Sequence, residues 1–289
     1  MPRKDIFDEA FDEGTLTKLE IFEKYFEQWL PTFIMRQDKI PIQVFDLFAG
    51  IGYDVKNIAG SPIRILEIIH KFKNLLIEKG KKVNLYFNEL DKKKFNSLVI
   101  NVNKKISELV LESFVNLEIT NDKFINCLKT NKSKFSNCAN LLFIDQNGFK
   151  EVNENVFRFL IKFNTTDFLF FISSAHIHRF VKTPEFNNIH PKFDADRIKN
   201  SSRLRVHNVV TEEYNKYIPN TISNYLLIPF SIMKNDNNNV YGLIFACKHP
   251  AAADKFLHTL WEINPINGNA NYDIDDDLSK DQLDLFEGK

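Results

Sequence analysis

The sequence VFDLFAGIG, residues 44–52, constrains the fold of this chain more than any other stretch. A run of apolar residues reaches Asp46 and is followed by Gly50 and Gly52, one residue apart. Buried parallel strands end in this way at turns that receive a phosphate or a nucleoside, because a glycine without Cβ lets the ligand approach the backbone amides. We therefore predict a central strand over residues 44–48. The turn after it either faces a ligand or is a tight strand-to-helix connection that binds nothing.

Strands and helices alternate from this turn to residue 172. Apolar runs predict strands over residues 83–87, 115–119, 141–144 and 168–172. Apolar periodicity predicts helices between them, one beginning at Ser61-Pro62 and stopping at Gly80, the others over residues 95–111 and 154–162. This alternation predicts an α/β fold with a doubly wound, mostly parallel sheet.

The segment before the central strand contains one amphipathic helix. Thr17 and Glu20 have the spacing of a capping box and precede an aromatic stripe that reaches Phe33. We predict that this helix packs on the sheet and that Pro31 kinks or ends it. Residues 1–14 are charged and aperiodic, which predicts a mobile arm, and residues 1–40 form the N-terminal arm and helix.

The pattern changes after residue 173. Residues 176–220 are polar and poorly periodic, which predicts an insertion or lid beyond the strand ends. Two apolar runs, residues 225–232 and 240–247, flank an Asn/Asp-rich turn and predict an antiparallel terminal hairpin. A last helix over residues 251–263 completes a domain of residues 41–263. Residues 264–289 are predicted to be an acidic, disordered tail.

Charge and cysteine content exclude several classes of protein. The formal net charge is zero, so the whole chain has no basic field that captures nucleic acid, and such a role needs a local patch. The three cysteines form no C-x-x-C pair, which argues against a disulfide framework or a thiolate metal site and predicts a reducing cytoplasm. No signal peptide is recognisable, and no apolar run reaches the ~18 residues of a membrane span.

Two acidic residues after later strands are candidate cofactor ligands. Glu89 follows the second strand, where a carboxylate can accept hydrogen bonds from both hydroxyls of a ribose. Its distance from Gly52 exceeds the usual interval of about 20 residues, and a solvated glutamate is the alternative. Asp122 follows the third strand and either meets an adenine amino group or caps the helix that begins at residue 123.

The order of these features resembles the S-adenosylmethionine-dependent methyltransferase fold. More specifically, the stretches GTLTKLEIFEKYFEQWL, FDLFAGIG, GSP, FIDQNG and YGLIFACKHPAAADKFLHTLW resemble the three-Cys-motif partner proteins, over roughly residues 14–263. The resemblance implies a methyltransferase-like Rossmann core of bacterial or phage origin that binds S-adenosylmethionine. It implies a partner protein with a three-cysteine motif, similar to radical enzymes. The implied cofactor-binding residues are Asp46, Phe48, Ala49, Gly50, Gly52, Glu89 and Asp122.

The chain departs from this family after the fourth strand. Family members tend to have Asp-Pro there, whereas this chain has Asp145-Gln146-Asn147-Gly148. A rigid Asp-Pro turn aims a backbone carbonyl at the amino group to be methylated, and the amides of Gln146 and Asn147 could replace that carbonyl with looser geometry. Asp145 would orient the acceptor, with Lys18 as a further contact.

Two functions therefore stay open. As an enzyme, the protein would methylate a nitrogen of a nucleic acid or of a modified base made by its partner. As a catalytically inactive module, it would bind the cofactor and serve the partner as a scaffold or sensor.

Three further patterns carry weaker hypotheses. DLFAGIG and Glu154-Asn155-Val156 are similar to motifs of DNA cytosine methyltransferases, but no cysteine follows a proline to act as nucleophile. His176, His178 and His190 could bind a metal if His176 and His178 shared a strand face, but structural or substrate-contacting histidines are favoured, and we predict no metal site. The arginines of the insertion form either a solvated face or a basic lip that holds phosphates: Arg179, Arg197, Arg203 and Arg205.

The acidic tail contains one apolar motif. Its sequence is QLDLF, formed by Gln282, Leu283, Asp284, Leu285 and Phe286. It is similar to the peptides with which bacterial replication proteins dock on the sliding clamp, presenting Leu285 and Phe286 to an apolar pocket. The alternative is that these side chains pack on the parent domain.

Overall fold

A seven-stranded sheet forms the centre of the computed structural model, which describes residues 10–146, 148–234 and 240–275. The strand order is β3-β2-β1-β4-β5-β7-β6. The strands are β1 (Ile42–Asp46), β2 (Val83–Asn88), β3 (Val115–Thr120), β4 (Ala139–Ile144), β5 (Thr166–Ile172), β6 (Leu226–Met233) and β7 (Val240–Cys247). β1 to β5 are parallel, whereas β7 is antiparallel to β5 and to β6. The predicted doubly wound sheet with an antiparallel terminal hairpin is confirmed, and it is a methyltransferase-like Rossmann arrangement.

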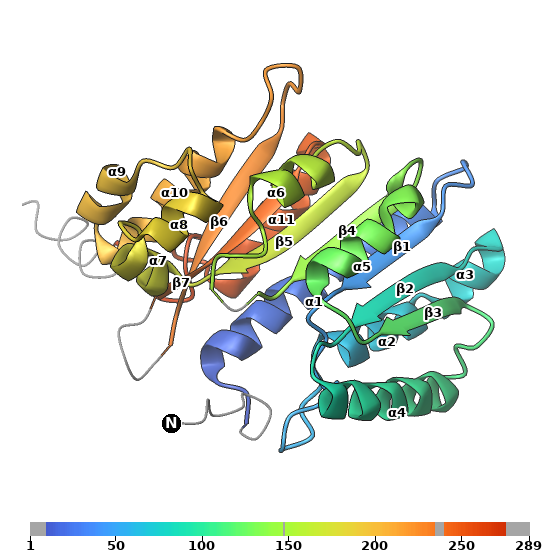
Figure 1. Ribbon diagram of the computed structural model, residues 1–289. Helices are drawn as coiled ribbons and strands as arrows, with labels where there is room; N and C mark the ends of the chain where they lie inside the picture. The colour runs from blue at the N-terminus through green and yellow to red at the C-terminus, as the bar shows by residue number, and fades with distance from the viewer. Residues whose placement is uncertain (1–9, 147, 235–239, 276–289) are drawn as a thin grey trace, which may run out of the picture.

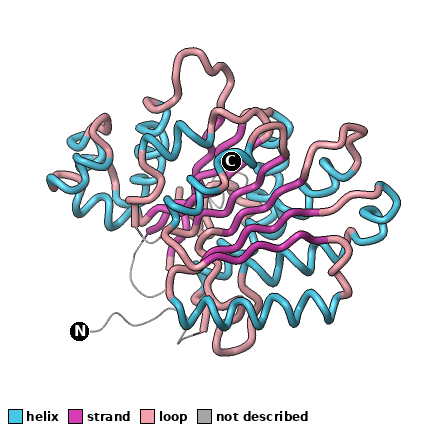
Figure 2. Tube along the Cα trace, turned by 45° about the vertical axis from the view of Figure 1, so that its right-hand side comes forward, coloured by secondary structure: helices cyan, strands magenta, loops and turns pink. Residues whose placement is uncertain are grey.

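Helices cover both faces of this twisted sheet (Figures 1 and 2). One face carries α1 (Glu13–Ile34), α2 (Ser61–Lys71), α3 (Lys73–Lys79), α4 (Lys92–Leu109) and α11 (Pro250–Ile263). The other carries α5 (Phe124–Thr130), α6 (Glu154–Leu160), α7 (Ser174–Phe180), α8 (Pro184–Ile189), α9 (Ala195–Asn200) and α10 (Val206–Asn215), with the short 3₁₀ helices η2 (Lys132–Phe135) and η3 (Arg203–Arg205). Neighbouring residues of β1 serve both cores, since Val44 faces the first layer and Phe45 the second. Among the described residues, no helix is long and apolar enough to cross a membrane.

The central strand lies two residues earlier than predicted. β1 ends at Asp46, and the Phe48 amide turns back to Asp46 Oδ1 at 3.3 Å. The Ala49 amide then bonds to the Asn88 carbonyl at 2.9 Å. Leu47 and Phe48 belong to the turn, where Leu47 is buried and Phe48 stacks on Phe124. Because both residues are apolar, the sequence pattern predicted a strand that continues to residue 48.

The first helix also begins earlier than the capping-box pattern predicts. Asp12 is the N-cap and accepts a hydrogen bond from the Thr15 amide at 2.7 Å, which places Thr17 inside α1. The predicted mobile arm is wrong for residues 10–14, because α1 begins at Glu13 and because Phe11 is buried and its amide bonds to Asp54 Oδ2 at 2.9 Å. Pro31 does not end the helix, which continues to Ile34.

α1 packs against the last helix of the chain. The Tyr25 ring lies between Phe245 of β7 and Phe256 of α11, at centroid distances of 4.7 Å and 5.7 Å. The Tyr25 hydroxyl and the Trp29 indole donate hydrogen bonds to Asp167 Oδ2 of β5, at 2.8 Å and 3.0 Å. Burial raises the pKa of Asp167 to about 6, and these two donors oppose the rise. The N-terminal and C-terminal helices therefore complete one shared core with the sheet.

Residues 174–217 are helical rather than irregular. α7 to α10 pack on the second face of the sheet, and their buried residues include Phe186, Tyr214 and Tyr217. Short periodic segments of six to ten residues gave too little pattern to be recognised in the sequence. The predicted lid is therefore a packed layer of the domain.

Residues 264–275, which composition assigned to the disordered tail, also pack on the domain. The Ser231 amide of β6 donates to the Asn269 carbonyl at 2.8 Å, and the Asn271 amide donates to the Ser231 carbonyl at 3.1 Å. Ile274 is buried. The QLDLF motif, residues 282–286, lies outside the described residues.

Candidate functional site

The strand order of the sheet reverses between β1 and β4. β1 is followed by β2 on one side, whereas β4 is followed by β5 on the other. In open α/β sheets such a switch point leaves a crevice at the carboxyl ends of the strands, and ligands bind there. Acidic residues lie at the carboxyl ends of three strands, since Asp46 ends β1, Glu89 follows β2 and Asp145 follows β4.

The two glycines after β1 adopt backbone conformations that other residues rarely reach. Gly50 has φ 64° and Gly52 has φ 93°. The Gly50 amide donates to Glu89 Oε2 at 3.1 Å, and Glu89 Oε1 accepts from the Asp91 amide at 2.8 Å. The sequence predicted that Glu89 and this turn bind the same cofactor, and the fold places them in direct contact.

Asp122 lies near this pair, but its carboxylate serves its own loop. Asp122 Oδ1 accepts from the Lys123 amide at 2.7 Å and from Asn126 Nδ2 at 2.8 Å. α5 begins at Phe124 with Lys123 at the N-cap position. The sequence analysis missed Asn88, whose Nδ2 donates to the Asp122 carbonyl at 2.9 Å and fixes this loop beside β2.

Asp46 is fully buried below the turn, and one of its carboxylate oxygens lacks a partner. Oδ2 makes no hydrogen bond to any described residue, whereas Oδ1 accepts from the Phe48 amide. Burial raises the pKa of Asp46 to about 7. A hydrogen bond from Ser61 opposes the rise, and the carboxylates of Asp145 and Glu89 add to it. A cationic ligand group at Oδ2 would relieve both the unmade hydrogen bond and the cost of ionisation.

Asp46 should therefore make the stability of the protein pH-dependent. Its folded-state pKa, about 7, lies above the ordinary aspartate pKa of 3.8, so the folded state holds the proton more tightly and Asp46 favours folding least above pH 7. The free energy of unfolding of Asp46→Asn, measured relative to that of wild type, should therefore increase by about 2–3 kcal/mol as the pH rises from 5 to 8. Urea unfolding at several pH values measures this difference. A difference independent of pH would contradict the raised pKa.

Lys18 and Asp145 form an ion pair across the fold. Lys18 Nζ of α1 donates to Asp145 Oδ2, directly after β4, at 2.5 Å. The Lys18 ammonium also lies 4.7 Å from the centroid of the Phe171 ring. Only 8% of the Lys18 side chain is exposed, compared with 29% of the Asp145 side chain, so the pair opens to solvent on the Asp145 side. The structure thus brings together the two residues that the sequence suggested for contact with an acceptor.

Gln146 does not have the position that its predicted role requires. The residue is fully buried, and Oε1 accepts hydrogen bonds from the Glu151 and Val152 amides at 2.8 Å and 3.3 Å. Gln146 Oε1 therefore stabilises the loop after β4 from within, and it is not free to replace the carbonyl of an Asp-Pro turn. Asn147 lies outside the described residues.

Tyr214 of α10 and His190, which follows α8, contact the same loop. His190 Nε2 is 2.9 Å from the Phe149 carbonyl, and Nδ1 is 3.0 Å from the Tyr217 hydroxyl. Burial lowers the pKa of His190 to about 4, so the ring is neutral, donates through Nε2 and accepts through Nδ1. Tyr214 donates its hydroxyl proton to the Val152 carbonyl at 2.7 Å. Sequence reasoning missed Tyr214 and Tyr217, since nothing local marks a contact with a loop more than 60 residues away.

The structure also bears on two further hypotheses, that histidines of residues 176–190 bind a metal and that arginines of the insertion form a basic lip. His176 and His178 lie in α7 rather than on a strand, so they do not share a strand face, and the described residues contain no group suited to a metal ion. Arg197 pairs with Glu212 and Glu213. Arg205 pairs with Asp275, and Arg179 lies against the Phe180 ring. Carboxylates of the domain therefore pair with two of the four arginines, Arg197 and Arg205.

Comparison with known proteins gives structural likeness at low identity. No family model and no curated protein matches the chain. A Legionella pneumophila protein assigned to family DUF519 is 14% identical, with 88% of this chain and 93% of that chain covered and a TM-score of 0.44. A protein described as a putative rRNA methylase from Clostridium thermocellum is 11% identical, with coverages of 80% and 96% and a TM-score of 0.40. The methyltransferase domain of a bacterial Hen1 is 12% identical, with coverages of 78% and 100% and a TM-score of 0.36. The methyltransferase-like fold therefore rests on the strand order and the antiparallel hairpin.

Proposed function

We propose that this protein binds S-adenosylmethionine at the carboxyl ends of β1, β2 and β4 and transfers its methyl group to a nitrogen of a nucleic acid or a base-derived substrate. One observation carries the proposal: the Gly50 turn and three carboxylates lie together at the switch point of the sheet. These are Asp46, with an oxygen that no described residue satisfies, Glu89 on the turn, and Asp145 beside Lys18. The motifs that resemble the three-Cys-motif partner proteins support a partner of that kind.

The residues at the crevice suit the parts of this cofactor. Asp46 Oδ2 would accept from the α-ammonium group, and the backbone from Phe48 to Gly52 would lie along the methionine portion. Glu89 would accept from the ribose hydroxyls, which requires its bond to the Gly50 amide to lengthen or be shared. Asp122 would meet the adenine only if its carboxylate left the Lys123 amide.

The reaction would depend on positioning by Asp145. The cofactor supplies a methyl group on a positively charged sulfur, and transfer needs the acceptor nitrogen held in line with it. Asp145 Oδ2 is held by Lys18, which leaves Oδ1 to accept a hydrogen bond from the acceptor amino group. A carboxylate there also stabilises the positive charge that develops on the nitrogen.

A second candidate function is a cofactor-binding scaffold or sensor without catalysis. One observation favours it: the amide oxygen of Gln146 is used inside the loop, so Gln146 does not replace the carbonyl of an Asp-Pro turn. The two functions share the cofactor site and differ only in methyl transfer.

Calorimetry tests the shared site. We expect saturable, one-to-one binding of S-adenosylmethionine and of its demethylated product to the full chain. Glu89→Ala should weaken this binding about 10–100-fold, because a charged hydrogen-bonding partner is worth about 1.5–3 kcal/mol. Glu108→Ala, at the far end of α4, is the control and should leave affinity unchanged. A folded protein with no affinity for either compound would reject the proposal.

Incorporation of a labelled methyl group separates the two functions. The full chain is incubated with labelled cofactor, mixed DNA and RNA, and the three-cysteine partner. Label in a nucleic acid or base supports the enzyme, whereas binding without transfer to any of these supports the scaffold.

A further inference from the structure

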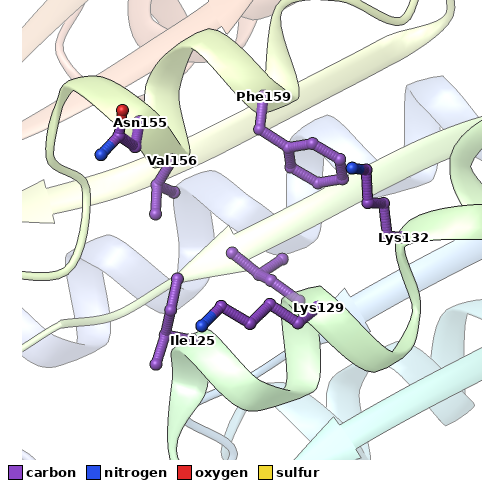
Figure 3. A pocket seen from close by; sticks show the side chains of 7 residues that line it. Ile125, Lys129, Lys132, Asn155, Val156 and Phe159 are labelled. Atoms are coloured by element: carbon purple, nitrogen blue, oxygen red, sulfur yellow. The ribbon is translucent and has the colours of Figure 1, made fainter.

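A shallow groove lies between α5 and α6. Its volume is about 180 Å³. The residues that line it are Ile125, Leu128, Lys129, Lys132, Asn155, Val156 and Phe159. Figure 3 shows side chains of α5 and the start of η2 facing those of α6 across it. A cavity of about 150 Å³ accepts a benzene molecule, so this groove is large enough for one phenyl ring.

The floor of the groove is apolar and its rim is cationic. Ile125 is 36% exposed although it is a large aliphatic residue, and it borders the buried Leu128 and Val156. Lys129 and Lys132 are exposed at the rim, and neither forms an ion pair within the described part of the chain. Nearby Lys134, in contrast, pairs with Glu118 at 2.7 Å. Such a groove is complementary to an acidic segment that carries one or two large apolar side chains.

We propose that this groove binds residues 281–287 of the same chain, DQLDLFE. The segment has three acidic residues, Asp281, Asp284 and Glu287, and no basic one. It also carries Leu283, Leu285 and Phe286, which match the apolar floor in character, and Phe286 matches it in size. Its acidic residues match the charge of Lys129 and Lys132.

The connection from the described residues begins beside the layer that carries the groove. Asp275 is held by Arg205 directly before α10, a helix on the face of the sheet that also carries α5 and α6. From residue 276 to residue 286 the chain can span up to ~36 Å when extended. This reach is almost twice the radius of gyration of ~19 Å expected for a domain of this size, and it favours a site on the same face of the sheet. Docking in cis is independent of whether the protein transfers a methyl group.

Hydrogen exchange of the full chain, followed by mass spectrometry, tests the proposal. We expect amides of residues 283–286 to exchange at least tenfold more slowly than in the variant Ile125→Asp. Ile125 is partly exposed at the second position of α5, where an acidic residue suits the helix N-terminus, so the variant should fold. Ile100→Asp is the matched control, because Ile100 is 66% exposed on α4, across the sheet, and this variant should keep the slow exchange.

A second variant tests the same contact from the tail. Phe286→Ala should abolish the slow exchange of residues 283–286 and speed exchange at residues 125–129. Equal exchange in wild type and Ile125→Asp would overturn the proposal. So would slowing that depends on protein concentration, which assigns the groove to a second copy, and slowing that appears only when a sliding clamp is added, which assigns the motif to that partner.

Discussion

Asp145→Ala should lower the rate of methyl transfer by at least ~100-fold while changing the affinity for S-adenosylmethionine less than about threefold. The reason is that Asp145 directly follows β4, where it would hold the acceptor, and that its carboxylate is hydrogen-bonded to Lys18, whereas the Gly50 turn is hydrogen-bonded to Glu89. A displacement of the acceptor by about 1 Å is enough for a loss of this size. Single-turnover rates and calorimetry on the same sample separate the two effects.

A matched pair of lysine variants refines this prediction. Lys18→Met should reproduce much of the loss, because Lys18 fixes Asp145 Oδ2 from α1. Lys24→Met, on the same helix, removes a half-exposed ion pair with Glu262 and should leave the rate unchanged. Full activity in Asp145→Ala would remove Asp145 from the proposed mechanism. Loss of cofactor affinity together with rate would instead place Asp145 in the cofactor site.

Gly242→Ala should destabilise the protein by about 3 kcal/mol, the largest effect that we expect from adding a single methyl group. A Cβ at Gly242 of β7 would lie 2.6 Å from His207 Cβ and 2.9 Å from Ile172 Cγ1. His207 Cβ is fixed by the backbone of α10, so α10 would have to move away from the sheet. The melting temperature should fall by about 5 °C, given the unfolding entropy of a chain of this length.

Gly14→Ala is the control for this substitution. A Cβ at Gly14 would lie 3.1 Å from Lys234 Cγ and 3.2 Å from Cγ2 of the buried Ile232, so these neighbours need to shift by only a few tenths of an ångström. Gly14 is in the first turn of α1, where alanine is favoured over glycine, so the melting temperature should fall by less than in Gly242→Ala. Equal stability of Gly242→Ala and wild type, measured by urea unfolding, would show that α10 is less tightly fixed than its contacts indicate.

The parts of the fold that the sequence predicts are those whose signals are local. The turn at Gly50 and Gly52, the strand before Glu89 and the hairpin of β6 and β7 each have their pattern within one continuous segment of the chain. The start of α1 was wrong because the Thr17 pattern is a good capping box in isolation. The true cap is Asp12, whose partner Lys234 lies 222 residues away.

The candidate site is less predictable than the fold, because its geometry comes from long-range contacts. Gln146 was expected to face an acceptor, yet its side chain turns inward to the Glu151 amide. Nothing in the residue type distinguishes the two orientations. The contacts of Tyr214 and His190 with the loop after β4 likewise depend on helices too short to give a clear period. Lys18 was suggested by family resemblance alone, and its pairing with Asp145 spans 127 residues.

The packing of α1 against α11 has a consequence for how the protein is made. α1 is complete at residue 34, whereas Phe256, which covers Tyr25, is synthesised more than 200 residues later. At about 5–20 residues per second, the ribosome needs roughly 10–45 s to add that stretch. During this time the aromatic face of α1 has no partner from α11, and the Tyr25–Phe256 contact cannot form. Nascent chains stalled before α11 should therefore expose an apolar surface that chaperones bind and proteases cut, and they should lose both sensitivities once α11 has left the ribosome.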